Sequence, residues 1–463
     1  MTLQILHIAH DHPAHTSGGT EFLAHDLTTA LDATEGVRAR FLAATTSLQR
    51  PGDLPGSLGM EGDDHLLRTG RYDRFSMLRQ DGTDWIASLG RLLGSFPPDV
   101  VHLHGLDRIG AEVLAVLRRL APRARIVLTL HDYQILCPND GLMLTVPDGA
   151  RCRRAGPDRC RGCYPAMPAA AHMLRKAHLT ALLSLVDRFI APSRFLADRF
   201  VEWGLAADRI TVLPNQVRRM AHPGRSSRAR PDRFAYFGSI APHKGILPLL
   251  AAARLAGDKV TLDLHGGLGH AEDAFRRDFA EALAVAPNAS HRGPFARDDL
   301  PALMSRADWV VVPSIWWENA PLVVLEARAA GLPVICSGIG GLAEMVNHGV
   351  TGLHVPPGDP RALAEVMRAA GAGQGADAPA GQRAARAAIL RRTVPGRIRP
   401  QQQADGAPHL GRDGAGQGIN PGPQDVAHNE QQQQLWTHDA VQFRLMRRGC
   451  CPGLMCVWYV PPP

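Results

Sequence analysis

The chain has 463 residues, enough for two or three domains, and its 45% hydrophobic content is sufficient for large cores. Its net charge of +7 suits phosphate-bearing substrates or an anionic membrane face, and it is too small and scattered to indicate a nucleic-acid-binding protein. No apolar run approaches the ~20 residues of a membrane span, the N-terminus has no signal-peptide pattern, and the cysteines are clustered, so a cytoplasmic protein is expected.

The N-terminal pattern predicts a strand over Leu3–Ala9, a loop that ends in Gly18 and Gly19, and a helix with Thr20 as the expected N-cap. Two glycines between a strand and a helix allow the backbone to approach a phosphate, although such a pair is more often a simple turn. The loop also holds His10, His12 and His15. Ordinary loop histidines are the favoured interpretation over a metal site, because no cysteine or carboxylate with ligand spacing completes a site.

Residues 46–84 are polar, Gly-rich and aperiodic, which predicts an insertion or an acceptor-side loop. A helix over 85–93 and strands over 99–104 and 126–130 are predicted next. The last of these strands runs into a polar cluster that contains His131, and ligands bind at the carboxyl edge of parallel sheets. His131 is therefore a candidate site residue, and a histidine satisfied at a strand end is the alternative.

Four cysteines occupy the Arg- and Gly-rich loop 137–163, which lacks apolar periodicity. Cys160 and Cys163 have metal-ligand spacing, and with Cys137 and Cys152 they would supply four thiolates for a structural zinc ion. The irregular spacing between Cys137 and Cys152 leaves unpaired thiols in a basic loop as the alternative.

A helix over 173–186 mixes basic residues with leucines, which favours a core helix over one that lies on a membrane or beside an acceptor lipid. Ser193 is expected to cap the following helix. The segment 218–233 is rich in Arg, Pro and Ser and has no periodicity, so it is the expected linker between an N-terminal domain, 1–217, and a second domain, 234–370.

The second domain opens with a strand that ends at Gly238, and Lys244 follows near a helix start. Lysine is a compact cation that suits a diphosphate leaving group.

Residues 308–337 predict a strand, a loop, a helix that begins at Pro321 and stops before Gly331, and a further strand. Glu318 then lies in the loop and Glu326 about one and a half turns inside the helix. The backbone amides of Asn319, Ala320 and Leu322 surround the helix start, where the helix dipole favours an anion, and both carboxylates can accept hydrogen bonds from sugar hydroxyls. Spacing alone leaves two interpretations, a nucleotide-sugar pocket or an ordinary strand–helix unit with solvated glutamates.

The pattern Glu318-x7-Glu326, with Asn-Ala-Pro-Leu between and Ala-Gly-Leu-Pro-Val after, resembles the donor motif of retaining glycosyltransferases of family 4. Gly340-Gly341, Glu344 and the stretch 349–353 continue the resemblance, which covers about residues 1–370. It implies the GT-B fold, in which two Rossmann-like, doubly wound parallel-sheet α/β domains face each other across a cleft.

The implied activity is transfer of a sugar, with retention, from a nucleotide-diphosphate sugar to a glycan, a lipid-linked molecule or another acceptor. An inactive nucleotide-binding paralogue and a truncated, non-functional form are the alternatives. The resemblance leaves two further points open: whether the acceptor is membrane-associated, and whether the protein is peripherally located at the inner face of the membrane.

The resemblance also assigns roles to matching residues. Glu318 would contact the transferred sugar, Glu326 the ribose, His131 the sugar's surroundings and Lys244 the leaving diphosphate. Further donor-binding positions are Gly18, Gly19, Ser239, Asn319, Ala320, Pro321 and Leu322. Many relatives carry Arg where this chain has Ser239, so one of two leaving-group cations is missing unless another Arg takes its place.

The first 370 residues contain no Asp-x-Asp motif, so no Mg²⁺ or Mn²⁺ clamp is expected and catalysis should need no cofactor. Lys244, the helix N-terminus and the Gly18-Gly19 amides would stabilise the leaving diphosphate.

Residues 371–463 depart from the pattern, with glutamine runs, scattered Gly, Pro and Arg, and no periodicity. Such a segment cannot bury enough apolar surface to order itself, so an irregular or disordered tail is expected. The resemblance implies helices here, including one that braces the N-terminal domain, and their absence suggests a shift of reading frame near residue 370. A genuine disordered extension is the alternative, and translation of the gene's other frames distinguishes the two.

Overall fold

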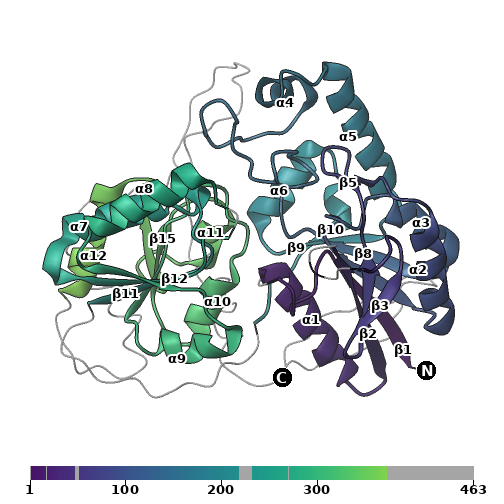
Figure 1. The fold of residues 1–463 in the computed structure, drawn as a ribbon, viewed down its shortest axis with the longest axis horizontal. Coiled ribbons are helices and arrows are strands. Elements are labelled where there is room, and N and C mark those ends of the chain that lie inside the picture. The colour runs from purple at the N-terminus through teal and green to yellow at the C-terminus, as the bar shows by residue number, and fades with distance from the viewer. Residues whose placement is uncertain are drawn as a thin grey trace, which may run out of the picture. The chain divides into compact units, whose positions relative to one another are not determined.

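The computed structural model describes residues 2–16, 18–46, 49, 52–217, 232–269 and 271–372 (Figure 1). Two largely parallel sheets, each with helices on both faces, account for most of this chain. The GT-B-type arrangement of two doubly wound α/β domains, expected from the sequence, is confirmed.

The first sheet has eight strands in the order β10-β9-β8-β7-β1-β2-β4-β3. Its described neighbours pair in parallel, except that β3 pairs antiparallel with β4. The strands are β1 (Leu3–Ala9), β2 (Val37–Thr45), β3 (Leu58–Glu61), β4 (Asp64–Arg68), β7 (Val100–His104), β8 (Arg125–Thr129), β9 (Arg188–Ala191) and β10 (Ile210–Val212). A separate pair comprises β5 (Tyr72–Asp73) and β6 (Leu78–Arg79).

The described residues of this half form six α-helices: α1 (Gly19–Asp32), α2 (Asp84–Ser95), α3 (Val113–Leu120), α4 (Pro157–Cys163), α5 (Ala169–Leu183) and α6 (Arg194–Trp203). Because side chains alternate along a strand, β1 contributes to cores on both faces of the sheet. Leu6 and Ile8 join the large core with residues of α2, α3, α5 and α6, whereas Ala9 packs with Phe41 and with Ala24 of α1.

The second sheet has six parallel strands in the order β13-β12-β11-β14-β15-β16. They are β11 (Arg233–Phe237), β12 (Thr261–His265), β13 (Ala289–Gly293), β14 (Trp309–Val312), β15 (Val334–Ser337) and β16 (Gly352–Val355). Its helices are α7 (Ile246–Ala256), α8 (Asp273–Ala284), α9 (Leu300–Met304), α10 (Leu322–Ala329), α11 (Gly340–Met345) and α12 (Pro360–Gly371).

The helices α7, α8 and α12 pack against one face of this sheet, and they group together in Figure 1. The helices α9, α10 and α11 pack against the other face. Residues of β14 divide between these layers, since Val311 belongs to the first core and Val310 and Val312 to the second. A strand buried on both faces explains the continuous apolar run in the sequence.

Most predicted elements are present, and Ser193 caps α6 as expected, its Oγ accepting from the Leu196 N–H at 3.2 Å. Two predictions about the N-terminal half are wrong. The first helix begins at Gly19 with Gly18 as N-cap, so Thr20 lies inside the helix. The loop predicted as one alternative for 46–84 is wrong, because β3 and β4 extend the sheet and bury Leu66 and Leu67, whereas the other alternative, an insertion, stays a prediction.

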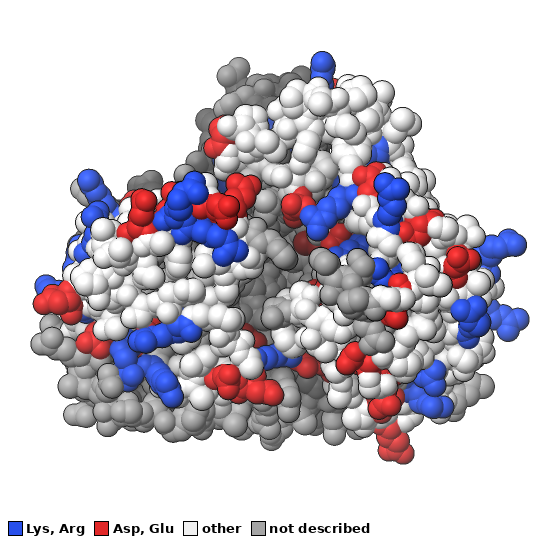
Figure 2. Space-filling model, viewed as in Figure 1, with Lys and Arg blue, Asp and Glu red and all other residues white. Residues whose placement is uncertain are grey.

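Helix α5 packs into the core through Leu179 and Leu183, in line with the favoured interpretation, while Met173 and Leu174 are exposed by 61% and 69%. No helix of the described residues is long and apolar enough to span a membrane. On the face drawn in Figure 2, positive and negative side chains of the described residues are interspersed.

The domain boundaries at 217 and 234 remain a prediction, because residues 218–231 of the expected linker lie outside the described chain. The tail from 373 onward lies outside it too, so the prediction of a disordered or out-of-frame segment is untested.

Candidate functional site

The loop between β14 and α10 buries the first glutamate of the donor motif. Glu318 is 5% exposed, and its Oε1 accepts hydrogen bonds from Ser314 Oγ at 2.8 Å and Lys244 Nζ at 2.7 Å. Burial by itself would raise the pKa of Glu318, but the charge of Lys244 and the hydrogen bonds hold the pKa below its ordinary value. Glu318 is therefore an ionised carboxylate, and its second oxygen is used in neither bond.

Close contact between two loops brings Lys244 to this carboxylate. Lys244 ends the 3₁₀ turn Pro242–Lys244 after β11, and Gly245 follows with φ of +73°. A Cβ at Gly245 would collide with the carbonyl oxygen of Pro313, so glycine is needed both for this backbone conformation and for the contact. The predicted catalytic pair Lys244 and Glu318 is thus brought together by backbone geometry.

Asn319 links the donor-motif loop to the first sheet. Its side chain donates from Nδ2 to the backbone oxygen of His131 at 3.1 Å, and its Oδ1 accepts from Ser193 Oγ at 2.7 Å. The residue is 7% exposed. These two bonds use one N–H of Nδ2 and one lone pair of Oδ1 and hold the loop in place, and the backbone N–H of Asn319 is left for the donor-binding role expected from the sequence.

The first turns of α1 and α10 adjoin each other. A Cβ at Gly19 would lie 3.4 Å from Cδ1 of Leu322, the first residue of α10, and Pro321 is the N-cap of that helix. The first amides of any helix lack intrahelical acceptors. Two helix starts of positive potential therefore lie side by side, which suits an anion with two phosphates. The carbonyl oxygen of Ala320 accepts from Asn215 Nδ2 at 3.3 Å.

The second glutamate of the motif, Glu326, is partly buried in α10. Burial raises its pKa, with Asp26 adding to the shift and Arg297 opposing it. Arg297 pairs with Asp26 at 2.7 Å and lies over the ring of Phe22, 4.5 Å from its centre. None of the described residues forms a recorded hydrogen bond with the Glu326 carboxylate, so it can accept from a ligand hydroxyl.

His131 follows β8, and burial lowers its pKa to about 3, with the nearby His102 and His10 adding to the effect. Its Nε2 lies 3.1 Å from Nδ1 of His104. Ser239 is exposed on the loop after β11, where its carbonyl oxygen accepts from the Tyr236 hydroxyl at 2.8 Å. A cation at this position is thus absent, as the sequence indicated.

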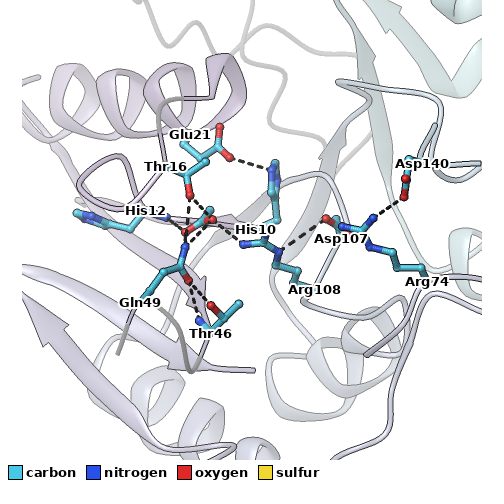
Figure 3. Close-up of polar contacts among 11 residues, drawn as sticks. His10, His12, Thr16, Glu21, Thr46, Gln49, Arg74, Asp107, Arg108 and Asp140 are labelled. Carbon is cyan, nitrogen blue, oxygen red and sulfur yellow. Dashed lines mark hydrogen bonds and ion pairs between the residues drawn. The ribbon is translucent and has the colours of Figure 1, made fainter. Parts of the chain in front are cut away.

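Figure 3 shows a polar network in the His-rich loop that the sequence analysis did not find. The carboxylate of Asp11 is 1% exposed and accepts from Arg108 at 2.6 Å and from Gln49 at 2.8 and 2.9 Å. Thr16 Oγ1 and the His12 N–H also donate to it. This carboxylate fixes the loop that leads to Gly18 and Gly19. Its partners come from segments far apart in the sequence, so no local motif signals it.

An ion pair flanks that network. His10 Nε2 lies 2.9 Å from Glu21 Oε1 (Figure 3). A Cβ at Gly18 would collide with the Glu21 carboxylate, so glycine leaves room for it. Burial opposes the charge of His10, but the hydrogen bond and charge of Glu21, with Asp107 and Asp132, raise the pKa of His10 to about 9. His10 is therefore a cation at neutral pH.

The four clustered cysteines line a single cavity of about 380 Å³ together with Arg151, Arg153 and Arg159: Cys137, Cys152, Cys160 and Cys163. None of them forms a disulfide. No three of their sulfur atoms lie within 4.8 Å of one another, so the described cysteines do not form a ready metal site. Burial raises the pKa of Cys137 to about 11, so its thiol is protonated in the absence of a metal.

Two groups of described residues do bring three potential metal-ligand atoms within 4.8 Å of one another, His7–His102–His104 and His12–His25–Asp64. In the second, both Nε2 atoms approach one carboxylate oxygen of Asp64, at 3.1 Å for His12 and 2.9 Å for His25. His12 Nδ1 accepts from the Ala14 N–H at 3.1 Å, which places the proton of a neutral ring on Nε2. That nitrogen then has no lone pair for a metal. The three residues instead connect the His-rich loop, α1 and β4 by hydrogen bonds.

Comparison with known families divides the chain into two matches. Residues 17–218 match the model described as Glycosyltransferase Family 4, and residues 221–386 match Glycosyl transferases group 1. The second match ends beyond residue 370, the point at which the sequence resemblance was expected to stop.

Curated relatives include the glycogen synthase of Mycobacterium tuberculosis, 35% identical over 214 residues that cover 45% of this chain and 50% of the relative. The D-inositol 3-phosphate glycosyltransferase of Paenarthrobacter aurescens is 32% identical over 195 residues, covering 39% of this chain and 48% of the relative. The matches thus span about half the length of these relatives.

Among solved structures, sucrose-phosphate synthase from Thermosynechococcus elongatus aligns with a TM-score of 0.62 at 21% identity, over 84% of this chain and 94% of that one. Anabaena HepE in complex with UDP and glucose aligns with a TM-score of 0.55 at 19% identity, over 84% and 99%. These likenesses show the GT-B fold, and the two family matches show that residues 17–218 and 221–386 are similar to glycosyltransferase domains.

Proposed function

We propose that the protein transfers a sugar from a nucleotide-diphosphate sugar to an acceptor, with retention of anomeric configuration and without a metal ion. The observation that carries the proposal is the ion pair between Lys244 and the buried Glu318 beside the start of α10. It sets a carboxylate that can accept from sugar hydroxyls next to a cation that can hold a phosphate.

The donor would lie with its diphosphate at the adjoining starts of α1 and α10. There Lys244, the amides from Asn319 to Leu322 and the backbone of Gly19 would stabilise negative charge as the leaving group departs. Glu326 would accept from the ribose, and Glu318 from the transferred sugar. Known proteins of this fold support the choice of donor, since HepE has been crystallised with UDP and with UDP-glucose.

Metal independence is proposed because positive charge at this site comes from the protein itself. Lys244 and two helix starts are present, and His10 adds an imidazolium on the neighbouring loop. Retention is proposed from the resemblance of the Glu318-x7-Glu326 pattern, and in the route we propose the departing phosphate assists the acceptor hydroxyl while Glu318 stays paired with Lys244 and Ser314.

The test is a panel of nucleotide-diphosphate sugars, with slow donor hydrolysis followed in the purified full-length chain. Hydrolysis of one donor, with release of the sugar in its original anomeric form, is expected, and Glu318→Ala should abolish most of it. Tight nucleotide binding without hydrolysis or transfer for any donor would instead support a non-catalytic nucleotide-binding protein.

A further inference from the structure

Three histidines form a continuous chain behind the candidate site. His7 lies within β1, His104 ends β7, and His131 follows β8, so the chain crosses three neighbouring strands of the first sheet. His7 Nδ1 lies 3.0 Å from His104 Nε2, and His104 Nδ1 lies 3.1 Å from His131 Nε2. Both nitrogens of His104 are thus used within the chain.

All three rings are neutral. Burial lowers the pKa of His7 and of His104 well below the ordinary value, and neighbouring histidines add to the effect. The pKa of His131 falls to about 3 for the same reasons. A neutral imidazole carries one N–H and one lone pair, so both hydrogen bonds can form only if the N–H groups of all three rings point the same way along the chain.

The inner end of the chain decides that direction. Nε2 of His7 is buried and has no hydrogen-bond partner. If the N–H groups pointed inward, a proton would sit on this nitrogen without an acceptor, and buried N–H groups of that kind are rare in proteins. If they point outward, His7 donates to His104 and His104 donates to Nε2 of His131. The single proton of His131 then sits on Nδ1.

We propose that His104 and His7 are positioning residues that hold His131 in its Nδ1–H tautomer, so that His131 donates a hydrogen bond to an oxygen of the nucleotide sugar. Its Nε2 is consumed by His104, and it therefore cannot serve as a general base through that nitrogen. No described residue forms a recorded hydrogen bond with Nδ1, and the ring is partly exposed, so a ligand can reach it. The identity of the ligand rests on the proposed function, whereas the tautomer does not.

The tautomer can be read in the free protein by NMR of the full chain labelled with ¹⁵N-histidine. The signals of His131 are identified by their loss in His131→Asn. We expect a pyridine-type shift for Nε2 and a pyrrole-type shift for Nδ1. The opposite assignment, or a charged ring at neutral pH, overturns the proposal whether or not any donor is turned over.

Two substitutions of His104 separate positioning from packing. The amide of His104→Gln can accept from His7 and donate to His131, whereas His104→Leu can do neither. We expect kcat for donor hydrolysis to fall about tenfold in His104→Leu with KM nearly unchanged, and to stay near wild type in His104→Gln. The His131 nitrogen shifts should change only in His104→Leu. Unchanged kcat and unchanged shifts in His104→Leu would contradict the proposal, and the wild-type spectrum decides it if that variant does not fold.

Discussion

The ammonium group of Lys244 lies 2.7 Å from the Oε1 of Glu318, a residue that is only 5% exposed. Removing one member of such a buried pair leaves an uncompensated charge. We expect Lys244→Met to lower the free energy of unfolding by about 3 kcal/mol. Adding Glu318→Gln removes the stranded charge and should recover much of that loss without recovering transfer. Denaturant unfolding of the wild type and both variants checks this, and equal stabilities of Lys244→Met and the double variant would contradict the predicted cost of the stranded charge.

Substitution of each of the two glutamates of the motif should impair a different step, one the chemical reaction and the other donor binding. Glu318→Ala is expected to lower kcat by about 10²-fold, because its carboxylate would face the reacting sugar. Glu326→Ala is expected to weaken donor binding instead, since Glu326 would hold the ribose. Titration of each variant with nucleoside diphosphate distinguishes them. Wild-type nucleotide affinity in Glu326→Ala would refute the ribose assignment.

The pair of His10 and Glu21 predicts a pH-dependent contribution to stability. The pKa of His10 is raised to about 9 despite its burial, chiefly by Glu21, so the folded state binds the proton more tightly than the unfolded state. The contribution is therefore complete below pH ~6.5 and is lost as pH rises through about 9.

Glu21→Gln should then lower the free energy of unfolding by up to about 3 kcal/mol below pH ~6.5 and by little above the pKa of about 9. The exposed Glu35→Gln is a matched control that should show no such trend. A constant difference between wild type and Glu21→Gln across this range would mean that His10 is not charged in the folded protein.

The unit from β14 to β15 was predictable because its signals are local. A run of buried residues, a proline at the helix start and Gly331 at its end each favour one conformation. The strand β4 was not predictable in this way. Leu66 and Leu67 are adjacent and both buried, since β4 lies between β2 and β3 with packing on both faces, and only the sheet reveals that.

The same distinction holds for the site. Motif residues such as Glu318 and Lys244 were found from the sequence, but their ion pair depends on the contact of Gly245 with Pro313. The alternation of His102 and His104 is visible in the sequence, whereas the addition of His7 follows from the pairing of β1 with β7. Long-range partners of this kind leave no trace in local spacing.

Donor hydrolysis should survive EDTA, because Lys244 and the two helix starts supply the positive charge that a metal would otherwise bring to the diphosphate. The measurement is the initial rate before and after chelation, with Mn²⁺ and Mg²⁺ added back separately. A strict requirement that either ion restores would refute metal independence at the candidate site.

The zinc hypothesis for the four cysteines makes a separate prediction. The thiols share one cavity with Arg151, Arg153 and Arg159, whose charges would offset the two negative charges of a zinc ion bound by four thiolates. The sulfurs must move closer together to bind it, because no three of them lie within 4.8 Å of one another. The hypothesis predicts one zinc ion per chain in the purified protein and its loss in Cys160→Ser.

Cys336, which is buried in β15 away from this cavity, offers the matched control, and Cys336→Ser should keep the metal. The loop also touches the donor motif, since Trp317 Nε1 donates to the carbonyl oxygen of Cys152 at 2.8 Å. Slow loss of donor hydrolysis in EDTA that Zn²⁺ alone reverses, and that Cys160→Ser reproduces, would therefore indicate a structural ion and not a catalytic one. Reaction of Cys137, Cys152, Cys160 and Cys163 with a thiol reagent in the folded protein, mapped residue by residue and with no bound metal, would establish the alternative, unpaired cysteines in a basic loop.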